Sequence, residues 1–221
     1  MDESELIITE DGSHTILFKH SNISYHSLHG AIAESTKIYI EYGLVKAFEF
    51  KNIIRIYEMG FGTGLNAYLS YIFASNNNIY IDYTCIEPYP IEEKIYSILN
   101  YPKLLNYDPE ILNNLHASEF SKQLQLSEKF KFQKIKCQWE YFNTIEKYDL
   151  IYYDAFGPGH DSALWDLNST MKLINMLNDN GILMSFCAQG QFKRNLKSAG
   201  FITEGLKGPI GKREVTRATK K

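Results

Sequence analysis

The chain has 221 residues, enough for one α/β domain with small additions. It is 44% hydrophobic and 22% charged with a net charge of −3, which excludes disordered and collagen-like chains. No apolar run reaches the ~18 residues of a membrane span, and the first twenty residues lack the basic and apolar stretches of a signal peptide. The three cysteines have no CxxC spacing, so we expect reduced thiols in a cytoplasmic protein.

The first 49 residues differ in pattern from the rest of the chain. The apolar runs 6–10 and 15–19 flank Asp11-Gly12, which is a strong signal for a hairpin turn. A helix is predicted to follow from about Ala31 to Phe48. We therefore expect residues 1–49 to form a small hairpin-and-helix extension attached to one larger domain, residues 50–221.

From about residue 50, short β-rich runs alternate with helical segments. The predicted strands are 53–59, 79–86, 130–137, 148–154 and 182–187. The predicted helices are a stretch after Pro90 together with 65–75, 109–125, 168–178 and 190–199. This alternation indicates parallel βαβ units in an α/β fold with an open, doubly wound, mostly parallel sheet. The segment after Phe201 predicts a C-terminal antiparallel hairpin.

The first predicted strand runs into Gly60-x-Gly62-x-Gly64 and then into a helix. Glycines allow a ligand to approach the backbone closely, and a helix start offers free N–H groups. A dinucleotide fingerprint would have glycine where Leu65 stands, and the Gly-Lys-Ser/Thr ending of triphosphate-binding loops is absent. The loop therefore predicts a nucleotide-like ligand other than NAD or a nucleoside triphosphate, although a lone glycine loop could also be an ordinary turn.

A carboxylate lies at the end of each of the first two predicted strands. Glu58 would repel a pyrophosphate but suits a ligand that carries an ammonium group. Glu87 ends the next strand, where a carboxylate can accept hydrogen bonds from both ribose hydroxyls. S-adenosylmethionine combines an ammonium group, a sulfonium and a ribose, so these residues predict it as the cofactor.

Asp154 and Phe156 follow the fourth strand, at the same carboxyl edge of the sheet. Methyl transfer to an amine needs a neutral nitrogen lone pair that is aimed at the methyl group. A carboxylate can orient the amine or accept its proton, and an aromatic ring can hold a flat base. Asp154 could instead only cap the turn after the strand.

Positive charge gathers at the C-terminal end of the chain. Residues 193–221 hold nine Lys or Arg against two Glu, although the whole chain is acidic. Such a cluster predicts a localised anionic partner. A solubilising tail is the alternative interpretation.

Six segments, in this order, resemble the methyltransferase domain of the MnmC family of tRNA-modifying enzymes in its stand-alone form. They are Tyr25-His26-Ser27-x-His29-Gly30-Ala31-x-x-Glu34-Ser35, Glu58-x-Gly60-Phe61-Gly62-Thr63-Gly64-Leu65-Asn66, Asp154-Ala155-Phe156-x-Pro158, Trp165, Cys187-Ala188-x-Gly190-x-x-x-Arg194-x-Leu196-x-x-Ala199-Gly200-Phe201, and Gly208-Pro209-x-Gly211-Lys212-Arg213-Glu214. The resemblance implies a Rossmann-like class I methyltransferase domain over residues 50–221. It further implies methylation of the aminomethyl nitrogen of 5-aminomethyl-2-thiouridine at the wobble position, in the anticodon loop of tRNA, without a flavin.

The resemblance also assigns roles to particular residues. Those implied to bind S-adenosylmethionine are Glu58, Gly60, Gly62, Gly64, Asn66, Glu87 and Asp154, with either Gln138 or Glu140 at the adenine. Asp154 and Phe156 would act on the acceptor base. The residues implied to meet phosphates of the substrate are Arg194, Lys212 and Arg213. From the residues alone we add Glu34, His29 and Trp165 as substrate-binding candidates, although Glu34 could instead cap the start of a helix and Trp165 could fill the core.

Other interpretations remain open from the residues alone. His14, His20, His26 and His29 match no zinc pattern, so we expect no metal, and His26 and His29 are predicted to line the substrate entrance. A small-molecule N-methyltransferase and an aminopropyltransferase of the spermidine synthase kind share the sheet and the glycine loop. An RNA-binding module without catalytic activity is the third alternative.

Overall fold

The computed structural model describes residues 4–221, so the first three residues of the predicted N-terminal extension lie outside the described part. The strands are β1 (Ser4–Ile8), β2 (His14–Phe18), β3 (Ile23–Ser24), β4 (Ile53–Met59), β5 (Tyr80–Ile86), β6 (Gln123–Ser127), β7 (Phe130–Ile135), β8 (Tyr148–Tyr153), β9 (Leu177–Ser185), β10 (Phe201–Lys207) and β11 (Glu214–Lys220). The helices are α1 (Ala31–Ser35), α2 (Val45–Phe48), α3 (Leu65–Asn77), α4 (Glu93–Tyr96), α5 (Tyr101–Leu105), α6 (Pro109–Ala117), α7 (Leu167–Met176) and α8 (Gly190–Ser198). A π-helical segment, Thr36–Leu44, joins α1 to α2, and a 3₁₀ turn, Ser162–Trp165, precedes α7.

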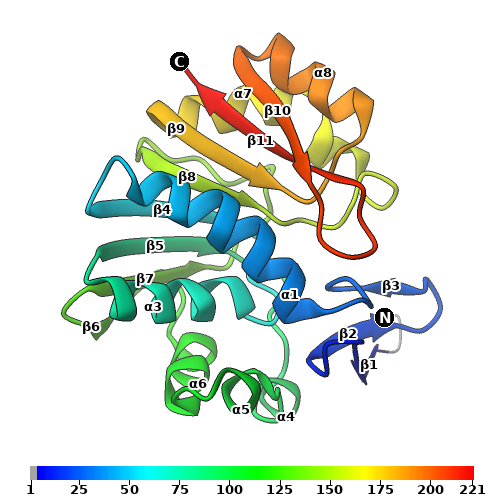
Figure 1. Ribbon diagram of the computed structural model, residues 1–221, viewed down its shortest axis with the longest axis vertical. Coiled ribbons are helices and arrows are strands. Elements are labelled where there is room, and N and C mark those ends of the chain that lie inside the picture. The colour runs from blue at the N-terminus through cyan, green and yellow to red at the C-terminus, as the bar shows by residue number, and fades with distance from the viewer. Residues whose placement is uncertain (1–3) are drawn as a thin grey trace.

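The main sheet of the described chain has the strand order β10-β11-β9-β8-β4-β5-β7-β6 (Figure 1). From β9 to β7 all neighbouring strands are parallel, whereas β6 and the β10–β11 hairpin run antiparallel at the two edges. The predicted Rossmann-like, doubly wound sheet with its C-terminal antiparallel hairpin is therefore confirmed. Its parallel order brings the ends of β4, β5 and β8 together at one edge, where open α/β sheets bind ligands.

Two sequence predictions were wrong in detail. The helix predicted over 109–125 ends at Ala117, and Gln123–Ser127 forms β6 instead. Polar and apolar residues alternate through β6, and Leu124 pairs with Phe132 of β7, so the strand period prevails over helix propensity. The fifth strand was predicted at 182–187 but spans Leu177–Ser185, with an irregular register opposite Tyr148.

Side chains of the central strands alternate between two cores. In β8, Leu150 and Tyr152 pack in the core shared with the helical segment 31–48 and α3, whereas Ile151 and Tyr153 pack in the core shared with α7 and α8. The sheet is thus covered by helices on both faces (Figure 1). Within residues 4–221 none of the helices has the length and apolar character needed to cross a membrane.

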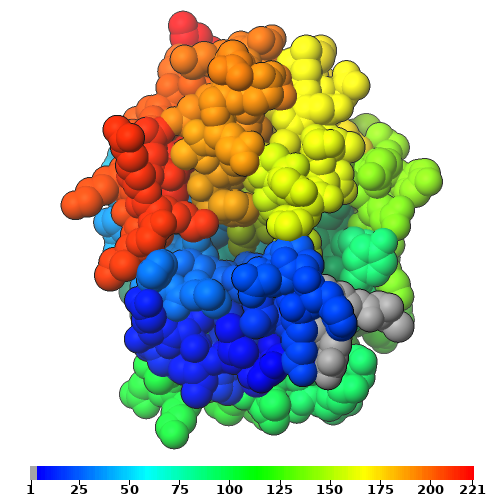
Figure 2. All heavy atoms as spheres, turned by 90° about the vertical axis from the view of Figure 1, so that its right-hand side faces the viewer, coloured from blue at the N-terminus to red at the C-terminus, as the bar shows by residue number. Residues whose placement is uncertain are grey.

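The N-terminal segment crosses the carboxyl edge of the main sheet. Strands β1, β2 and β3 form a separate antiparallel sheet, in which the predicted hairpin around Asp11-Gly12 is present. In the space-filling view this blue segment meets the yellow-to-red C-terminal third of the chain (Figure 2). The division into an extension (1–49) and a domain (50–221) stays a prediction.

Candidate active site

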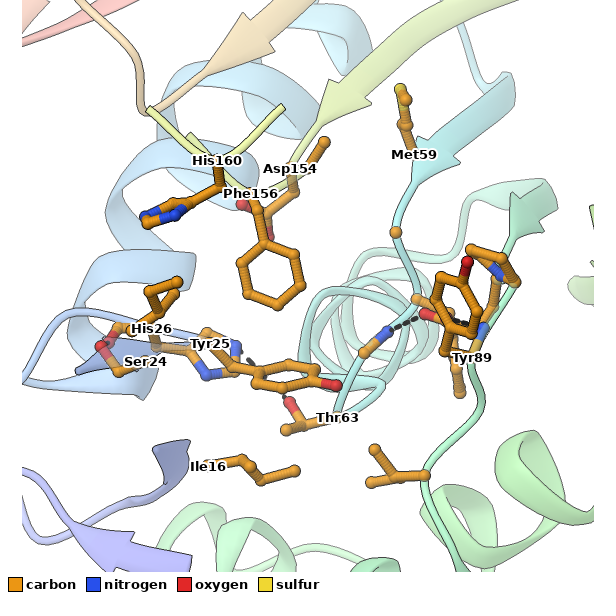
Figure 3. A pocket seen from close by; sticks show the side chains of 18 of the residues that line it. Ile16, Ser24, Tyr25, His26, Met59, Thr63, Tyr89, Asp154, Phe156 and His160 are labelled. Carbon is orange, nitrogen blue, oxygen red and sulfur yellow. Dashed lines mark hydrogen bonds between the residues drawn. The ribbon is translucent and has the colours of Figure 1, made fainter. Parts of the chain in front are cut away.

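A cavity of about 910 Å³ lies at the carboxyl ends of β4, β5 and β8, with residues of β2 and β3 in one wall (Figure 3). Small-molecule sites usually measure roughly 300–1,000 Å³, so the cavity has room for a nucleoside-sized cofactor and a second group. The sequence-predicted residues that line it are Glu34, Gly60, Gly62, Asn66, Glu87, Gln138, Glu140, Asp154, Phe156 and Lys212. Residues far apart in the chain therefore meet in one place.

The glycine loop forms the floor of this cavity between β4 and α3. Gly60, Gly62 and Gly64 have φ values of 88°, 51° and 73°, which L side chains rarely adopt. A Cβ on Gly62 would lie 3.0 Å from the Tyr25 ring, so the glycine also permits close approach of the N-terminal segment. The loop presents bare backbone to the cavity and then begins α3 at Leu65.

Glu87 connects the end of β5 to the glycine loop. Its Oε2 accepts a hydrogen bond from the Gly62 N–H at 2.9 Å and its Oε1 accepts one from the Tyr89 N–H at 2.7 Å. Burial raises the pKa of this carboxyl, and the backbone N–H donors oppose that rise. The carboxylate is thus held at the cavity wall with lone pairs left for hydroxyl donors.

Asp154 has two side-chain donors at the end of β8. Tyr39, in the π-helical segment, donates to Asp154 Oδ1 at 2.6 Å, and Asn66 Nδ2 donates to Asp154 Oδ2 at 2.8 Å. Burial raises the pKa of Asp154 to about 6, the charge of Glu34 adds to the rise, and the two donors and Lys212 oppose it. Asp154 is therefore a carboxylate near its midpoint at mildly acidic pH, which suits proton transfer.

Glu58 lies beneath the cavity, outside the set of residues that line it. The side chain is 1% exposed, and its Oε1 accepts a hydrogen bond from Asn66 Nδ2 at 2.9 Å. Burial raises the pKa of Glu58 well above its ordinary value. The structure thus puts Asn66 between Glu58 and the cavity, so the predicted direct contact of Glu58 with a cofactor ammonium stays a prediction.

Glu34 and Lys212 form an ion pair in the cavity wall. The Lys212 Nζ lies 3.0 Å from Glu34 Oε1, while Glu34 Oε2 accepts a hydrogen bond from the Ser27 N–H at 2.7 Å. Glu34 lies in α1, and Lys212 lies in the turn between β10 and β11. The N-terminal and C-terminal parts of the chain therefore meet at this pair.

Aromatic rings lie between Asp154 and the N-terminal sheet. Phe156 stands edge-on to Tyr25 at 5.3 Å between ring centroids (Figure 3). The centroid of the Phe18 ring lies 6.0 Å from that of Phe156. His26 also lines the cavity, and burial lowers its pKa to about 4, so its ring is neutral at physiological pH. This wall offers flat apolar surfaces against which a base could stack.

Besides Glu58, five of the predicted site residues lie outside this cavity lining. Gly64 faces Phe61 and His116 under the loop, and His29 pairs with Glu10 at 2.9 Å. Trp165 is 3% exposed, and its Nε1–H donates to the Phe156 carbonyl at 2.9 Å, so it supports the Phe156 loop from behind. The exposed residues Arg194 and Arg213 lie in α8 and in the β10–β11 turn.

The model of the S-adenosyl-L-methionine-dependent methyltransferase family matches residues 101–221, which is more than half of the chain. The chain belongs to this family. It is thus an enzyme of the methyltransferase class, and S-adenosyl-L-methionine is its cofactor.

Known relatives agree with this assignment. The methyltransferase is 23% identical to an uncharacterized protein of Methanocaldococcus jannaschii, over 99% of this chain and 60% of that one. It is 28% identical to the tRNA 5-methylaminomethyl-2-thiouridine biosynthesis bifunctional protein MnmC of Marinomonas sp., over 75% of this chain and 26% of that protein. The methyltransferase therefore spans less than two thirds of either relative, and the resemblance to MnmC proteins is confirmed.

Two solved structures share the fold. MNMC2 from Aquifex aeolicus superposes with a TM-score of 0.80 at 24% identity, covering 100% of this chain and 72% of that one. Spermidine synthase from Thermotoga maritima gives a TM-score of 0.60 at 16% identity, covering 100% of this chain and 71% of that one. At these identities the likeness concerns the fold alone.

The cavity of the methyltransferase fits its cofactor. Three glycines with positive φ form a loop without side chains that a ligand can approach closely, and the Glu87 carboxylate lies beside this loop. Asn66 Oδ1 is a buried acceptor with no hydrogen-bond partner among the described residues, as expected if a ligand ammonium donates to it. No cluster of three or more potential metal ligands occurs within residues 4–221.

Both candidates for the adenine contact line the cavity of the methyltransferase. Gln138 Nε2 donates to the Tyr89 hydroxyl at 2.9 Å, and Glu140 lines the same part of the cavity. Tyr89 lies across the cavity from His26 and Phe156 (Figure 3). The choice between Gln138 and Glu140 stays open as a prediction.

Three tyrosines in the site of the methyltransferase were missed by sequence reasoning. Tyr25 covers the glycine loop, Tyr39 binds Asp154, and Tyr89 lines the wall opposite. The chain holds 16 tyrosines, most of them in strand-like runs, so composition could not single these out. Only Tyr25 had a signal, because it begins the first of the segments that resemble MnmC.

Proposed function

We propose that this methyltransferase methylates the aminomethyl nitrogen of 5-aminomethyl-2-thiouridine at the wobble position of tRNA, giving 5-methylaminomethyl-2-thiouridine. The observation that carries the proposal is the pair of carboxylates, Asp154 and Glu34, in one cavity with the glycine loop. Two carboxylates suit an acceptor that arrives as a cation, which an alkylamine does at neutral pH. The similarity to MnmC proteins supports the choice of this particular amine.

The cofactor would lie along the glycine loop. The Glu87 carboxylate would accept hydrogen bonds from the ribose hydroxyls, and Asn66 Oδ1 would accept one from the ammonium group. Gln138 or Glu140 would meet the adenine. When bound, S-adenosylmethionine supplies an electrophilic methyl group on a sulfonium.

Asp154 would prepare the acceptor amine. A protonated amine has no lone pair, so the site must deliver it neutral and oriented. Tyr39 and Asn66 hold the Asp154 carboxylate in place, and one of its oxygens would take an N–H proton from the amine. Phe156 and Tyr25 would hold the ring of the base, which has to leave the anticodon stack to reach the cavity.

The basic C-terminal region would contact the RNA backbone. Within the described chain, ion pairs with Glu or Asp engage Lys193, Lys212, Arg217 and Lys220. The five basic side chains of this region without such a pair in residues 4–221 are Arg194, Lys197, Lys207, Arg213 and Lys221. Their charges remain available for phosphates.

The double variant Lys212→Ala/Arg213→Ala is expected to bind tRNA about tenfold or more weakly, with unchanged affinity for S-adenosylmethionine. Each lost phosphate contact should also lower the slope of log affinity against log salt by about one. Titrating labelled tRNA at several salt concentrations measures both quantities. An unchanged tRNA affinity would favour a small-molecule acceptor.

The direct test is methylation in vitro. The protein is incubated with labelled S-adenosylmethionine and with tRNA that carries 5-aminomethyl-2-thiouridine, and the digested nucleosides are analysed by mass spectrometry. A gain of one methyl group on that nucleoside is expected. Transfer only to free amines would support a small-molecule methyltransferase, transfer only from decarboxylated S-adenosylmethionine an aminopropyltransferase, and tRNA binding without transfer an inactive RNA-binding module.

A further inference from the structure

Lys212 reaches into the cavity from a tightly held turn. The turn is closed by hydrogen bonds from the Gly208 N–H to the Arg213 carbonyl at 3.2 Å and from the Lys212 N–H to the Pro209 carbonyl at 2.9 Å. The side chain is 27% exposed, and its ammonium lies 4.5 Å from the centre of the Phe186 ring. The backbone is thus fixed while the long side chain keeps access to solvent.

The partner of Lys212 is a buried carboxylate. The Glu34 side chain is 9% exposed, and its Oε1 has no hydrogen-bond partner in the described chain, only the Lys212 ion pair at 3.0 Å. An uncompensated buried carboxylate is unfavourable, so Glu34 needs a cation at this position. Without a ligand, Lys212 is that cation.

The chemistry of Lys212 matches that of the proposed acceptor. Both are primary ammonium groups on a methylene carbon, and both would lie beside Asp154, whose pKa is influenced by the charges of Glu34 and Lys212. Two ammonium groups cannot share one carboxylate oxygen in a confined cavity without repulsion. Lys212 therefore marks the position of a cation subsite and also blocks it.

We propose that Glu34 is the subsite for the acceptor's ammonium group, and that Lys212 fills this subsite until an RNA phosphate draws it away. This inference rests on the proposed function. Arg213 is exposed beside Lys212, so a phosphate bound there comes within reach of the flexible lysine side chain. RNA-borne amines would then find Glu34 free, whereas free alkylamines would have to compete with Lys212.

The variant Lys212→Met separates these two classes of acceptor. Methionine keeps an apolar stem on Phe186 but removes the charge. The catalytic efficiency for the free nucleoside 5-aminomethyl-2-thiouridine is expected to rise about fivefold, while that for an anticodon stem-loop carrying the same nucleoside falls about fivefold. Lys122→Met, which breaks the exposed pair with Glu119 away from the cavity lining, is expected to change neither.

The effect should depend on Glu34. In a Glu34→Gln background, Lys212→Met is expected to leave the free nucleoside unaffected, because there is no carboxylate left for which to compete. If Lys212→Met lowers or does not change the efficiency for the free nucleoside in the wild-type background, the inference is overturned. Thermal unfolding and S-adenosylmethionine affinity establish that each variant is folded.

A binding measurement keeps this inference separate from the proposed function. Butylammonium is titrated calorimetrically into wild-type and Lys212→Met protein loaded with S-adenosylhomocysteine. Tighter binding to the variant is expected, and equal or weaker binding contradicts the subsite even if RNA is methylated. If neither acceptor is methylated but the variant binds butylammonium more tightly, the proposed function fails and the cation subsite stands.

Discussion

Asp154→Ala is expected to lower kcat by ~100-fold or more, the usual scale for a lost acid–base group, with the affinities for S-adenosylmethionine and tRNA unchanged. The reason is that Asp154, held by Tyr39 and Asn66, is proposed to orient the acceptor amine and take its proton. Asp154→Asn should recover little of the activity, because an amide cannot accept the proton. Single-turnover methylation of tRNA measures the chemical step directly.

The control for this experiment is Asp179→Asn, because the Asp179 side chain is 83% exposed in β9. It should behave as wild type. Near-normal turnover of Asp154→Asn at neutral pH would mean that the carboxylate only positions the amine. Loss of cofactor affinity in Asp154→Ala would mean that Asp154 binds the cofactor and does not act on the acceptor amine.

The same carboxyl should set the acidic limb of the pH–rate profile. Burial raises the pKa of Asp154 to about 6, and only the ionised form can accept a proton, so kcat should fall about tenfold per pH unit below that value. Because the pKa is higher in the folded than in the unfolded chain, protonation favours folding, and this contribution is lost as pH rises from about 4 to 6. The residual activity of Asp154→Asn should therefore lack the acidic limb. At neutral pH the unfolding temperature of this variant should be no lower than that of the wild type.

Glu87→Ala is expected to weaken S-adenosylmethionine binding by about 100-fold, since hydrogen bonds to a charged group contribute roughly 1.5–3 kcal/mol each. The substitution removes the proposed ribose contacts and the two bonds that hold Gly62 and Tyr89. Calorimetry measures the affinity. Glu93→Ala, an exposed position outside the cavity lining, serves as the matched control and should bind normally.

A modified ligand distinguishes the two roles of Glu87. S-adenosylhomocysteine that lacks both ribose hydroxyls should bind the wild-type protein more weakly than the parent ligand does. The Glu87→Ala variant should bind the two ligands with nearly equal affinity. If the two losses add, Glu87 acts only by anchoring the glycine loop, and the ribose contact is disproved.

The sequence by itself determined the sheet, the glycine loop and the carboxyl edge on which the site lies. These follow from local signals: alternating strand and helix patterns impose parallel order, and parallel order gathers the residues that follow Met59, Ile86 and Tyr153 at one edge. Gly60 and Gly62 were predictable because their backbone conformation itself requires glycine. The strand β6 was missed because a five-residue strand after a helix gives a weak periodic signal.

The tertiary structure alone decided what each side chain does at that edge. Tyr39 and Asp154 are 115 residues apart, and no spacing rule predicts their 2.6 Å hydrogen bond. Glu58, predicted to meet the ligand, is buried and bonded to Asn66, and Lys212, predicted to meet phosphates, pairs with Glu34 in the cavity wall. Both roles stay predictions. The physical reason is that a strand pattern specifies where the backbone ends, whereas burial and the need to satisfy buried charges determine where the side chains point.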